Sequence, residues 1–171
     1  MSHEEHRREG PREVELAVVT ASDTRSAADD ASGAWLRAAA VEAGHPVVSY
    51  DVVRDEPDAI RAALARAVAA GARVVVVNGG TGVAARDRTY EAVAGLLEKR
   101  LDGFGELFRM LSYQEVGSAA MMSRAVAGIW RGCAVFSLPG STAAVRLAWQ
   151  KLIAPELPHL ARELRGFERP G

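Results

Sequence analysis

Four consecutive valines, Val74–Val77, run directly into the loop Asn78-Gly79-Gly80-Thr81-Gly82. A continuous β-branched run of this kind is typical of a strand that is buried on both faces of a parallel sheet. The loop after it carries little side chain, so its glycines can adopt positive φ angles and let another molecule approach the backbone N–H groups. The sequence therefore predicts a buried strand that ends in an anion-binding loop, and phosphate is the expected anion.

The composition limits the classes of partner. At 171 residues the chain can bury a sizeable core, and we expect one domain over residues 13–171 behind a solvated tail, residues 1–12. The 21 basic and 22 acidic residues nearly balance, so no overall field would recruit nucleic acid or an anionic membrane surface. No apolar stretch approaches the ~20 residues of a membrane span. Any anion-binding site must therefore be local.

The single cysteine, Cys133, opens the apolar run Cys133–Phe136. We expect it to be a small core side chain rather than a nucleophile or half of a disulfide. The N-terminal segment also lacks the apolar core of a signal peptide. Together these features predict a reducing, cytoplasmic setting.

Apolar strands alternate with amphipathic helices along the chain. This alternation predicts an α/β fold with three layers, in which helices cover both faces of a mostly parallel sheet. Gly103-Phe104-Gly105 is expected to break the helical pattern, and residues 112–117 to join two short helical pieces. The predicted strands are 14–20, 47–53, 73–78, 125–130 and 133–138, the last two around a turn at Arg131-Gly132, and the predicted helices are 31–43, capped by Asp30 or Ser32, 57–70, 90–100, 106–111, 118–122, 142–152 and 156–165.

Polar or glycine-rich loops follow four of these strands. In a parallel sheet such loops share one edge, which is where ligands bind in this class of fold. The loops predicted for the opposite edge, around Gly44 and Gly71, are short and carry little chemistry. We therefore expect a ligand site to be built from four segments: Ser22–Arg25, including Asp23, Arg54–Glu56, Asn78–Gly82 and Leu138–Ser141.

Two known phosphate-binding designs can be compared with the glycine loop. A nucleotide P-loop requires Lys and a hydroxyl residue after its last glycine, and Val83-Ala84-Ala85 stands there instead, which excludes that design. Gly80–Ala85 does match the dinucleotide pattern G-x-G-x-x-A. However, it follows the third strand rather than the first, and no strand ending in an acidic residue comes ~20 positions later. A dinucleotide-binding oxidoreductase remains an alternative.

Asp55 and Asp87 follow the ends of two different strands and are candidates for a shared metal site. Mg²⁺ prefers a few carboxylates together with substrate phosphates and water. The alternative is that each aspartate caps the helix after it. Thr89 is the better-placed cap for the second of these helices, which would leave Asp87 free for catalysis.

Arg86, beside the glycine loop, is the arginine best placed to bind a phosphate, whereas Arg25 and Arg88 are expected to be solvated charges. Ser141 follows Pro139-Gly140 and is the expected N-cap of the next helix. Because a helix N-terminus also attracts anions, Gly140 and Ser141 can contribute to the same phosphate site.

In order and spacing, these segments resemble the MogA/MoaB family of molybdenum cofactor biosynthesis proteins, whose fold recurs in gephyrin-like proteins. The most specific part is the glycine loop followed by Arg86-Asp87 and then Thr89. The resemblance extends over nearly the whole chain from Val14. The matching segments are Ser22-Asp23-Thr24-Arg25, Asp30-Ala31-Ser32-Gly33, Asp55-Glu56, Gly79-Gly80-Thr81-Gly82, Arg86-Asp87 to Thr89, Gly103-Phe104-Gly105-Glu106 and Leu138-Pro139-Gly140-Ser141.

The resemblance implies a molybdopterin-binding domain that forms a homotrimer in most of this family, with a hexamer as the alternative. Family members with demonstrated chemistry transfer adenylate from ATP to the pterin phosphate with Mg²⁺, which releases pyrophosphate. The acidic residues of the family site fall here on Asp55 and Asp87. A second implication stays open, because a MoaB-type relative can keep the pterin pocket as a non-catalytic carrier of the same pathway.

Overall fold

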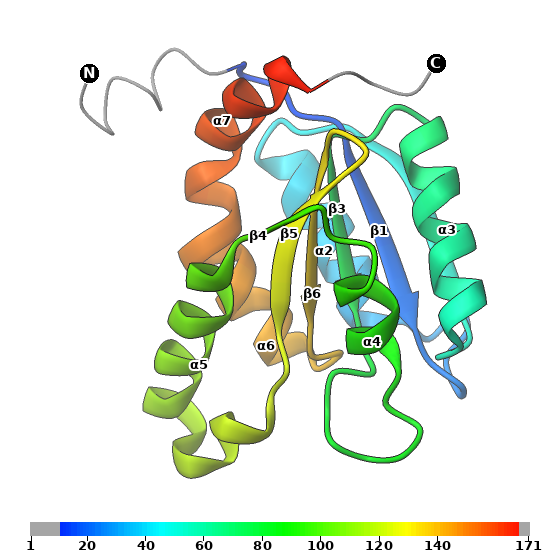
Figure 1. Ribbon diagram of the computed structural model, residues 1–171, viewed down its shortest axis with the longest axis vertical. Coiled ribbons are helices and arrows are strands. Elements are labelled where there is room, and N and C mark those ends of the chain that lie inside the picture. Colours follow the sequence, from blue (N-terminus) through cyan, green and yellow to red (C-terminus); the bar gives the residue numbers. More distant parts are fainter. Residues whose placement is uncertain (1–10, 168–171) are drawn as a thin grey trace.

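The computed structural model describes residues 11–167, and its centre is a six-stranded sheet in the order β2-β1-β3-β6-β5-β4. β1, β2, β3 and β6 run parallel, while β5 pairs antiparallel with both β6 and β4. The predicted mostly parallel sheet is therefore confirmed (Figure 1). The strands are β1 Leu16–Ala21, β2 Val47–Val53, β3 Val74–Asn78, β4 Lys99–Arg100, β5 Val126–Trp130 and β6 Cys133–Leu138.

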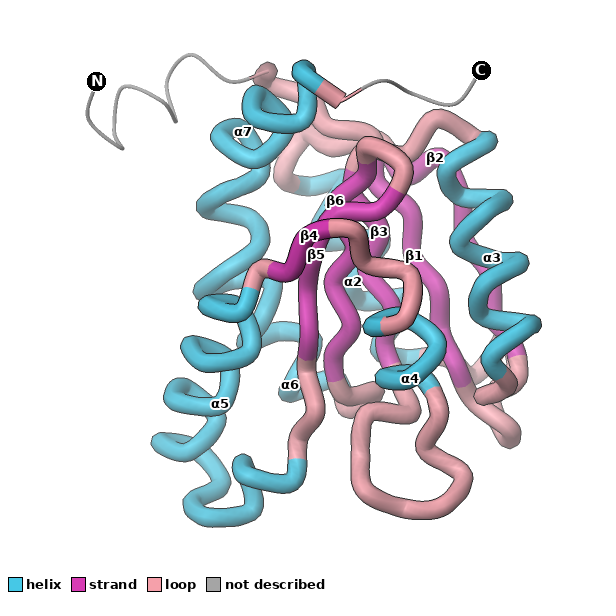
Figure 2. Tube along the Cα trace, viewed as in Figure 1, coloured by secondary structure: helices cyan, strands magenta, loops and turns pink. Residues whose placement is uncertain are grey.

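Helices cover both faces of the sheet, as Figure 2 shows. Helices α3 and α4 pack on one face, and helices α2, α5, α6 and α7 pack on the other. The described helices are α2 Ala31–Glu42, α3 Pro57–Ala69, α4 Thr89–Ala94, α5 Asp102–Val116, α6 Thr142–Ala148 and α7 Ala154–Glu163, with a π-helical turn Trp149–Ile153 and 3₁₀ segments Gly117–Met122 and Leu164–Gly166.

The valine run explains why β3 occupies a central position. Val74 and Val76 join the core below α2, α5, α6 and α7, while Val75 and Val77 join the core below α3 and α4. All four are at most 1% exposed, because successive side chains of a strand point to opposite faces. The strand therefore has no solvent-facing side. Cys133 is also buried and donates to the carbonyl of Ala72, which confirms that it is a core residue.

The predicted helix 90–100 is wrong over its second half. α4 ends at Ala94, and Lys99–Arg100 instead form β4 at the edge of the sheet. The N–H of Glu98 donates to the carbonyl of Ile129 at 2.8 Å, so the chain leaves the helical path to pair with β5. Pairing with a strand that lies about thirty residues away overrides the local helical pattern.

The predicted break at Gly103-Phe104-Gly105 is also wrong, since these residues form the first turn of α5. Phe104 and Phe108 pack into the core from this turn, and their rings lie 6.1 Å apart. A Cβ on Gly105 would lie 2.7 Å from the carbonyl oxygen of Ala125, so this glycine permits close packing. The helix continues through the predicted connection 112–117 and ends at Gly117, which has a φ of +66°.

The remaining predicted elements agree with the structure to within a few residues, apart from helix 142–152. That helix is α6 followed by the π-helical turn, which leads directly into α7. Arg131 and Gly132 form the predicted turn, with φ angles of +48° and +71°. The predicted tail, residues 1–12, lies almost wholly outside the described residues. Within residues 11–167, no helix is both long and apolar enough to cross a membrane.

Candidate phosphate and metal site

The loops after the four parallel strands line one pocket of about 320 Å³. The register of the sheet explains this, because Asn78 at the end of β3 pairs with Thr20 of β1 and with Leu138 of β6. The strands thus end at one level and their loops meet. The lining residues are Ala21, Ser22, Asp23, Thr24, Arg25, Asp55, Gly79, Gly80, Arg86, Asp87 and Gly140.

Three predicted site residues lie outside this lining. Thr81 is buried, and Gly82 presents its carbonyl to the guanidinium of Arg124. Ser141 is the N-cap of α6, as predicted, and accepts from the N–H of Ala144 at 3.2 Å. These residues shape the loops around the pocket, while the lining residues face it.

The glycine loop depends on positive φ at two positions. Gly79 has a φ of +116° and Gly80 a φ of +54°. A Cβ on Gly80 would lie 2.0 Å from Oδ2 of Asp55 and 2.3 Å from the hydroxyl of Thr89, so the missing side chain makes room for both groups. Gly79 donates its own N–H to the carbonyl of Leu138, and that N–H therefore belongs to the fold rather than to a ligand.

Asp55 lines the pocket but is only 6% exposed. One carboxylate oxygen, Oδ1, accepts from the Thr89 hydroxyl at 2.9 Å and from the N–H of Arg88 at 3.3 Å. Burial raises the pKa of Asp55, with Asp87 and Asp23 adding repulsion, and the two hydrogen bonds only partly offset this. Helix α3 takes Glu56 as its N-cap without a side-chain bond, so the capping alternative for Asp55 is wrong.

Asp87 lies in the loop between β3 and α4, which Figure 2 shows projecting from the sheet edge. Its Oδ2 accepts from the N–H of Ala84 at 2.9 Å, and its N–H donates to the carbonyl of Ala84 at 3.0 Å. Asp87 does not cap α4, whose N-cap residue is Arg88. The predicted cap, Thr89, is wrong as well, because its hydroxyl donates to Asp55 instead.

Arg86 connects three of the loops. Its guanidinium donates to Asp23 at 2.7 Å and to Glu56 at 3.1 Å, although the side chain is 62% exposed. The hydrogen bond from Arg86 lowers the pKa of Asp23. A phosphate that approached Arg86 would therefore have to share this guanidinium with two carboxylates, so the predicted role in phosphate binding requires some rearrangement.

Arg25 is exposed, as predicted, but its guanidinium also has partners within the protein. Its Nη1 donates to the carbonyl of Gly140 at 2.9 Å and to the hydroxyl of Ser32 at 3.0 Å. The bond to Gly140 ties the loop after β1 to the loop after β6 across the pocket. Arg25 and Ser32 both belong to segments that resemble the MogA/MoaB family, which is the one sign in the sequence that they act together. The contact with Gly140 spans more than a hundred residues, so no local pattern indicates it.

A buried polar network supports the pocket from below. Asp30, the N-cap of α2, accepts from Thr20 at 2.6 Å, from Tyr50 at 2.7 Å and from the N–H of Gly33 at 3.0 Å. Burial alone would raise the pKa of Asp30, but these hydrogen bonds outweigh it and lower the pKa. Burial and the bond to Asp30 raise the pKa of Tyr50 to about 12. The network keeps the carboxylate ionised and the phenol neutral.

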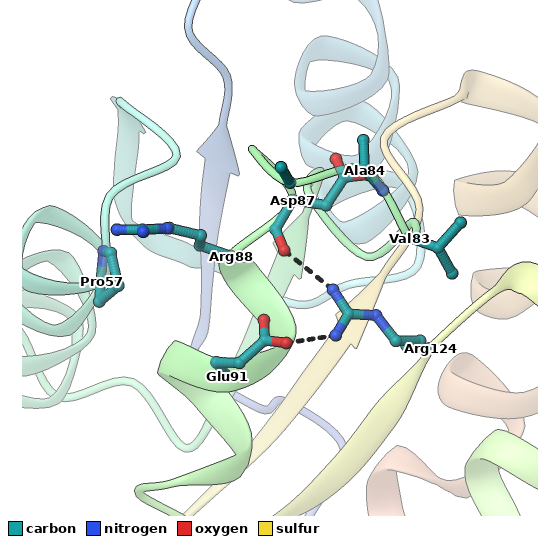
Figure 3. Close-up of a pocket in the computed structure, with 8 residues that line it drawn as sticks. Pro57, Val83, Ala84, Asp87, Arg88, Glu91 and Arg124 are labelled. Atoms are coloured by element: carbon teal, nitrogen blue, oxygen red, sulfur yellow. Dashed lines mark hydrogen bonds and ion pairs between the residues drawn. The ribbon is translucent and has the colours of Figure 1, made fainter.

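A second cavity of about 540 Å³ adjoins the first, and Asp87 lines both. Figure 3 shows Asp87 between Ala84 and the guanidinium of Arg124, which contacts Asp87 and Glu91. Sequence reasoning missed Arg124, because nothing in its neighbourhood indicates a partner about forty residues earlier. The cavity is lined by Pro57, Val83, Ala84, Ala85, Asp87, Arg88, Glu91 and Arg124.

The two aspartates fit a divalent cation that shares its coordination with a substrate. Among residues 11–167 there is no cluster of three or more His, Cys, Asp or Glu side chains that could hold a metal by itself. Asp55 and Asp87 line the same pocket, and their mutual repulsion contributes to the raised pKa of Asp55. Two carboxylates whose hydrogen bonds come only from N–H and hydroxyl groups suit Mg²⁺, which takes its other ligands from phosphates and water.

We expect Asp55→Asn to stabilise the empty protein, raising Tm near pH 7 by about 2–4 °C, equivalent to about 1 kcal/mol. The pKa of Asp55 is raised on folding, so its ionisation costs stability above the ordinary value of 3.8, whereas an amide oxygen can still accept from Thr89 and Arg88. The gain should shrink as the pH falls and disappear below 3.8, where Asp55 is protonated in both states. Thermal melts at several pH values would measure it.

Asp58→Asn is the matched control, because the side chain of Asp58 is fully exposed on α3 and its ion pair with Arg61, at 3.6 Å, is a weak surface pair. It should leave Tm nearly unchanged. If Asp55→Asn instead lowered Tm near pH 7, the negative charge of Asp55 would be a stabilising feature of the empty site, contrary to our interpretation.

The fold and site define an α/β protein whose strand-end loops form a polar pocket with a glycine loop and two carboxylates. Residues 17–159 match the model of a family described as "Probable molybdopterin binding domain". The chain belongs to this family, and within it to the MogA/MoaB group of molybdenum cofactor biosynthesis proteins.

Relatives and solved structures place the chain within the group. It is 52% identical over 167 residues to molybdenum cofactor biosynthesis protein B of Bacillus subtilis (strain 168), covering 96% of this chain and 98% of that protein. A crystal structure of a molybdenum cofactor biosynthesis protein B has a TM-score of 0.83 at 51% identity, covering 91% of this chain and 98% of the other. The tungsten cofactor synthesizing protein MoaB from Pyrococcus furiosus has a TM-score of 0.83 at 38% identity, covering 91% and 99%.

Proposed function

We propose that this protein acts in molybdenum cofactor biosynthesis, where it binds molybdopterin and adenylylates its phosphate with Mg-ATP, releasing pyrophosphate. The observation that carries the proposal is the pair of adjoining cavities that share Asp87. Two substrates whose phosphates react with each other require two neighbouring pockets. The names of the relatives support the pathway, and the carboxylates support the metal.

In this reaction the nucleophile is an oxygen of the molybdopterin phosphate. It forms a bond to the α-phosphorus of ATP as the bond between that phosphorus and the bridging oxygen breaks, and pyrophosphate leaves with that oxygen. The protein has no covalent step to perform, so its task is to position two phosphates and to offset their charge. This suits a pocket whose lining contains no cysteine or histidine.

Each group of residues has a separate part in the proposal. Asp55 and Asp87 would hold Mg²⁺, which when bound offsets the charge of the reacting phosphates. Backbone N–H groups in the glycine loop beyond Gly79 would hold a phosphate, since the N–H of Gly79 itself donates to Leu138. Ser22, Asp23 and Gly140 would line the substrate pocket, and Arg86 would reach a phosphate by exchanging its carboxylate partners.

A non-catalytic molybdopterin carrier is the second candidate. It requires the 320 Å³ pocket but gives no role to the adjoining cavity or to the raised pKa of Asp55. These two features favour the enzyme over the carrier.

The dinucleotide-binding alternative conflicts with the structure. The fingerprint glycines should open a helix directly, whereas α4 begins at Thr89, well after Ala85. The family to which the chain belongs also argues against this alternative.

Incubating the purified protein with molybdopterin, ATP and Mg²⁺ tests the proposal directly. We expect pyrophosphate and adenylylated molybdopterin to form in equal amounts, and chelation of the metal to stop both. Binding of molybdopterin without pyrophosphate release would favour the carrier. No binding of molybdopterin would remove both candidates.

We also propose a homotrimer, with a hexamer as the alternative, in the predicted cytoplasmic setting. The supporting observation is an apolar surface on α5 and the 3₁₀ segment after it, whose side chains are about half exposed or more. Light scattering of the purified protein would give the mass, and a monomer would remove this part of the proposal. The surface consists of Leu107, Met110, Tyr113, Val116, Met121 and Met122.

A further inference from the structure

The segment Gly82–Arg88, which carries Asp87, has no hydrophobic anchor of its own. None of its residues is buried, and Val83 is 68% exposed. A loop without buried apolar contacts is expected to open easily unless polar contacts hold it. Its internal bonds are the pair between Ala84 and Asp87, with a further bond from the N–H of Thr89 to the carbonyl of Gly80.

Arg86 and Arg88 tie the loop to Asp23, Glu56 and Asp55 on one side. Arg124 supplies a second anchor, from the segment just before β5. Its Nε donates to the carbonyl of Gly82 at 2.8 Å, and its Nη2 donates to the carbonyl of Asp87 at 2.9 Å. The backbone N–H of Arg124 donates to the carbonyl of Thr81 at 3.0 Å. One residue therefore binds both ends of the loop, as Figure 3 shows for the contact with Asp87.

The guanidinium is itself held in place from two further sides. Its Nη1 is paired with the carboxylate of Glu91 on α4, which lowers the pKa of Glu91. The guanidinium also lies over the ring of Tyr90, 5.0 Å from the ring centre. The guanidinium is planar and its N–H groups point in fixed directions. Holding its orientation therefore also holds the carbonyls of Gly82 and Asp87 in place.

We propose that Arg124 is a positioning residue that clamps the segment Gly82–Arg88 and thereby orients the carboxylate of Asp87 toward the pocket. Each of the three guanidinium nitrogens donates to an acceptor within the protein, so Arg124 can act through the loop although it also lines the 540 Å³ cavity. The catalytic consequence rests on the proposed adenylyl transfer. The clamp itself does not, and it can be tested on the free protein.

Amide hydrogen exchange tests the clamp without any substrate. In Arg124→Ala, the amides of Ala84, Asp87 and Thr89 should exchange at least about 10-fold faster than in the wild type, while the amides of β3 remain unchanged. Arg124→Lys should behave similarly, because one ammonium cannot reach both carbonyls and Glu91 in the fork geometry. Wild-type exchange rates in both variants would overturn the proposal.

Steady-state kinetics test the consequence for Asp87. Arg124→Ala and Arg124→Lys should lower kcat about 10–100-fold with less than a threefold change in KM for ATP. If Arg124→Lys restored turnover, or if KM for ATP rose while kcat stayed constant, Arg124 would act as a charge facing the substrate and the positioning role would be wrong. If the wild type shows no turnover, the proposed function fails, and the exchange measurement still decides the clamp.

Two control variants separate the clamp from general effects of removing charge. Glu91→Gln leaves an amide oxygen that can accept from Nη1 and keeps the bonds from Arg124 to both carbonyls, so loop exchange should stay within about threefold of the wild type. Arg66→Ala removes an arginine whose ion pair with Asp51 lies outside both cavities, and it should change neither readout. Equal losses in Arg66→Ala and Arg124→Ala would overturn the proposal.

Discussion

Replacing Asp87 with Asn is expected to lower the proposed adenylyl transfer at least about 100-fold while molybdopterin binding stays within about threefold. Asn keeps the size of the side chain, and its amide oxygen can still accept from the N–H of Ala84. The change removes one negative charge from the pair that would hold Mg²⁺. Turnover should be measured as pyrophosphate release and binding by calorimetry with molybdopterin alone.

The position of Asp87 explains why the effect should fall on turnover. It borders both cavities, whereas Asp23 and Ser22 line only the 320 Å³ pocket. Asp51→Asn is a suitable control, because Asp51 forms an ion pair with Arg66 outside both cavities. Unchanged turnover in Asp87→Asn would remove the metal role. A loss of molybdopterin binding equal to the loss of turnover would instead assign Asp87 to the pterin pocket.

Gly79→Ala is expected to cause the largest loss of stability, about 3 kcal/mol, which for a chain of this size lowers Tm by about 6–12 °C. At a φ of +116° an L side chain is strained, and its Cβ would lie 2.0 Å from the carbonyl oxygen of Ala21. That oxygen belongs to the backbone at the end of β1, so a side-chain rotation cannot relieve the clash. Thermal or urea unfolding would measure the loss.

Gly71→Ala separates strain from steric clash. Gly71 has a φ of +91°, but a Cβ there would have no atom within 4 Å. Only the backbone strain remains, and the expected loss is about 1 kcal/mol. If the two variants lost equal stability, the close approach of Gly79 to β1 would contribute nothing, and the tight packing of the loops around the pocket would not explain why glycine stands at this position.

The prediction of the sheet succeeded because the signals are local. The apolar runs of β1, β3 and β6 and the helical periodicity of α2 and α3 are visible within windows of about ten residues. Parallel connectivity then places the following loops on one edge without further information. The sequence therefore predicts that Gly79, Gly80, Asp55 and Gly140 meet at one edge of the sheet, and all four line the same pocket.

The errors occur where distant contacts decide the local structure. Lys99–Arg100 form a strand because β5 offers backbone partners, and α5 runs through Gly103-Phe104-Gly105 because Gly105 packs against the carbonyl of Ala125. Thr89 had the composition of a helix cap but donates to Asp55, which lies 34 residues earlier. In each case the competing partner is remote in the chain, so a local pattern cannot reveal it.

The α/β class, the strand-end location of the pocket and the family resemblance can all be read from the sequence, because they depend on residue types at short spacing. The pairing of the charges is visible only in the folded chain. Arg86 binds Asp23 and Glu56, Arg25 reaches Gly140, and Arg124 holds the loop of Asp87. A long arginine side chain can reach any of several acceptors that folding brings within a few ångströms. Its partner is therefore set by the packing of helices, strands and loops rather than by its neighbours in the chain.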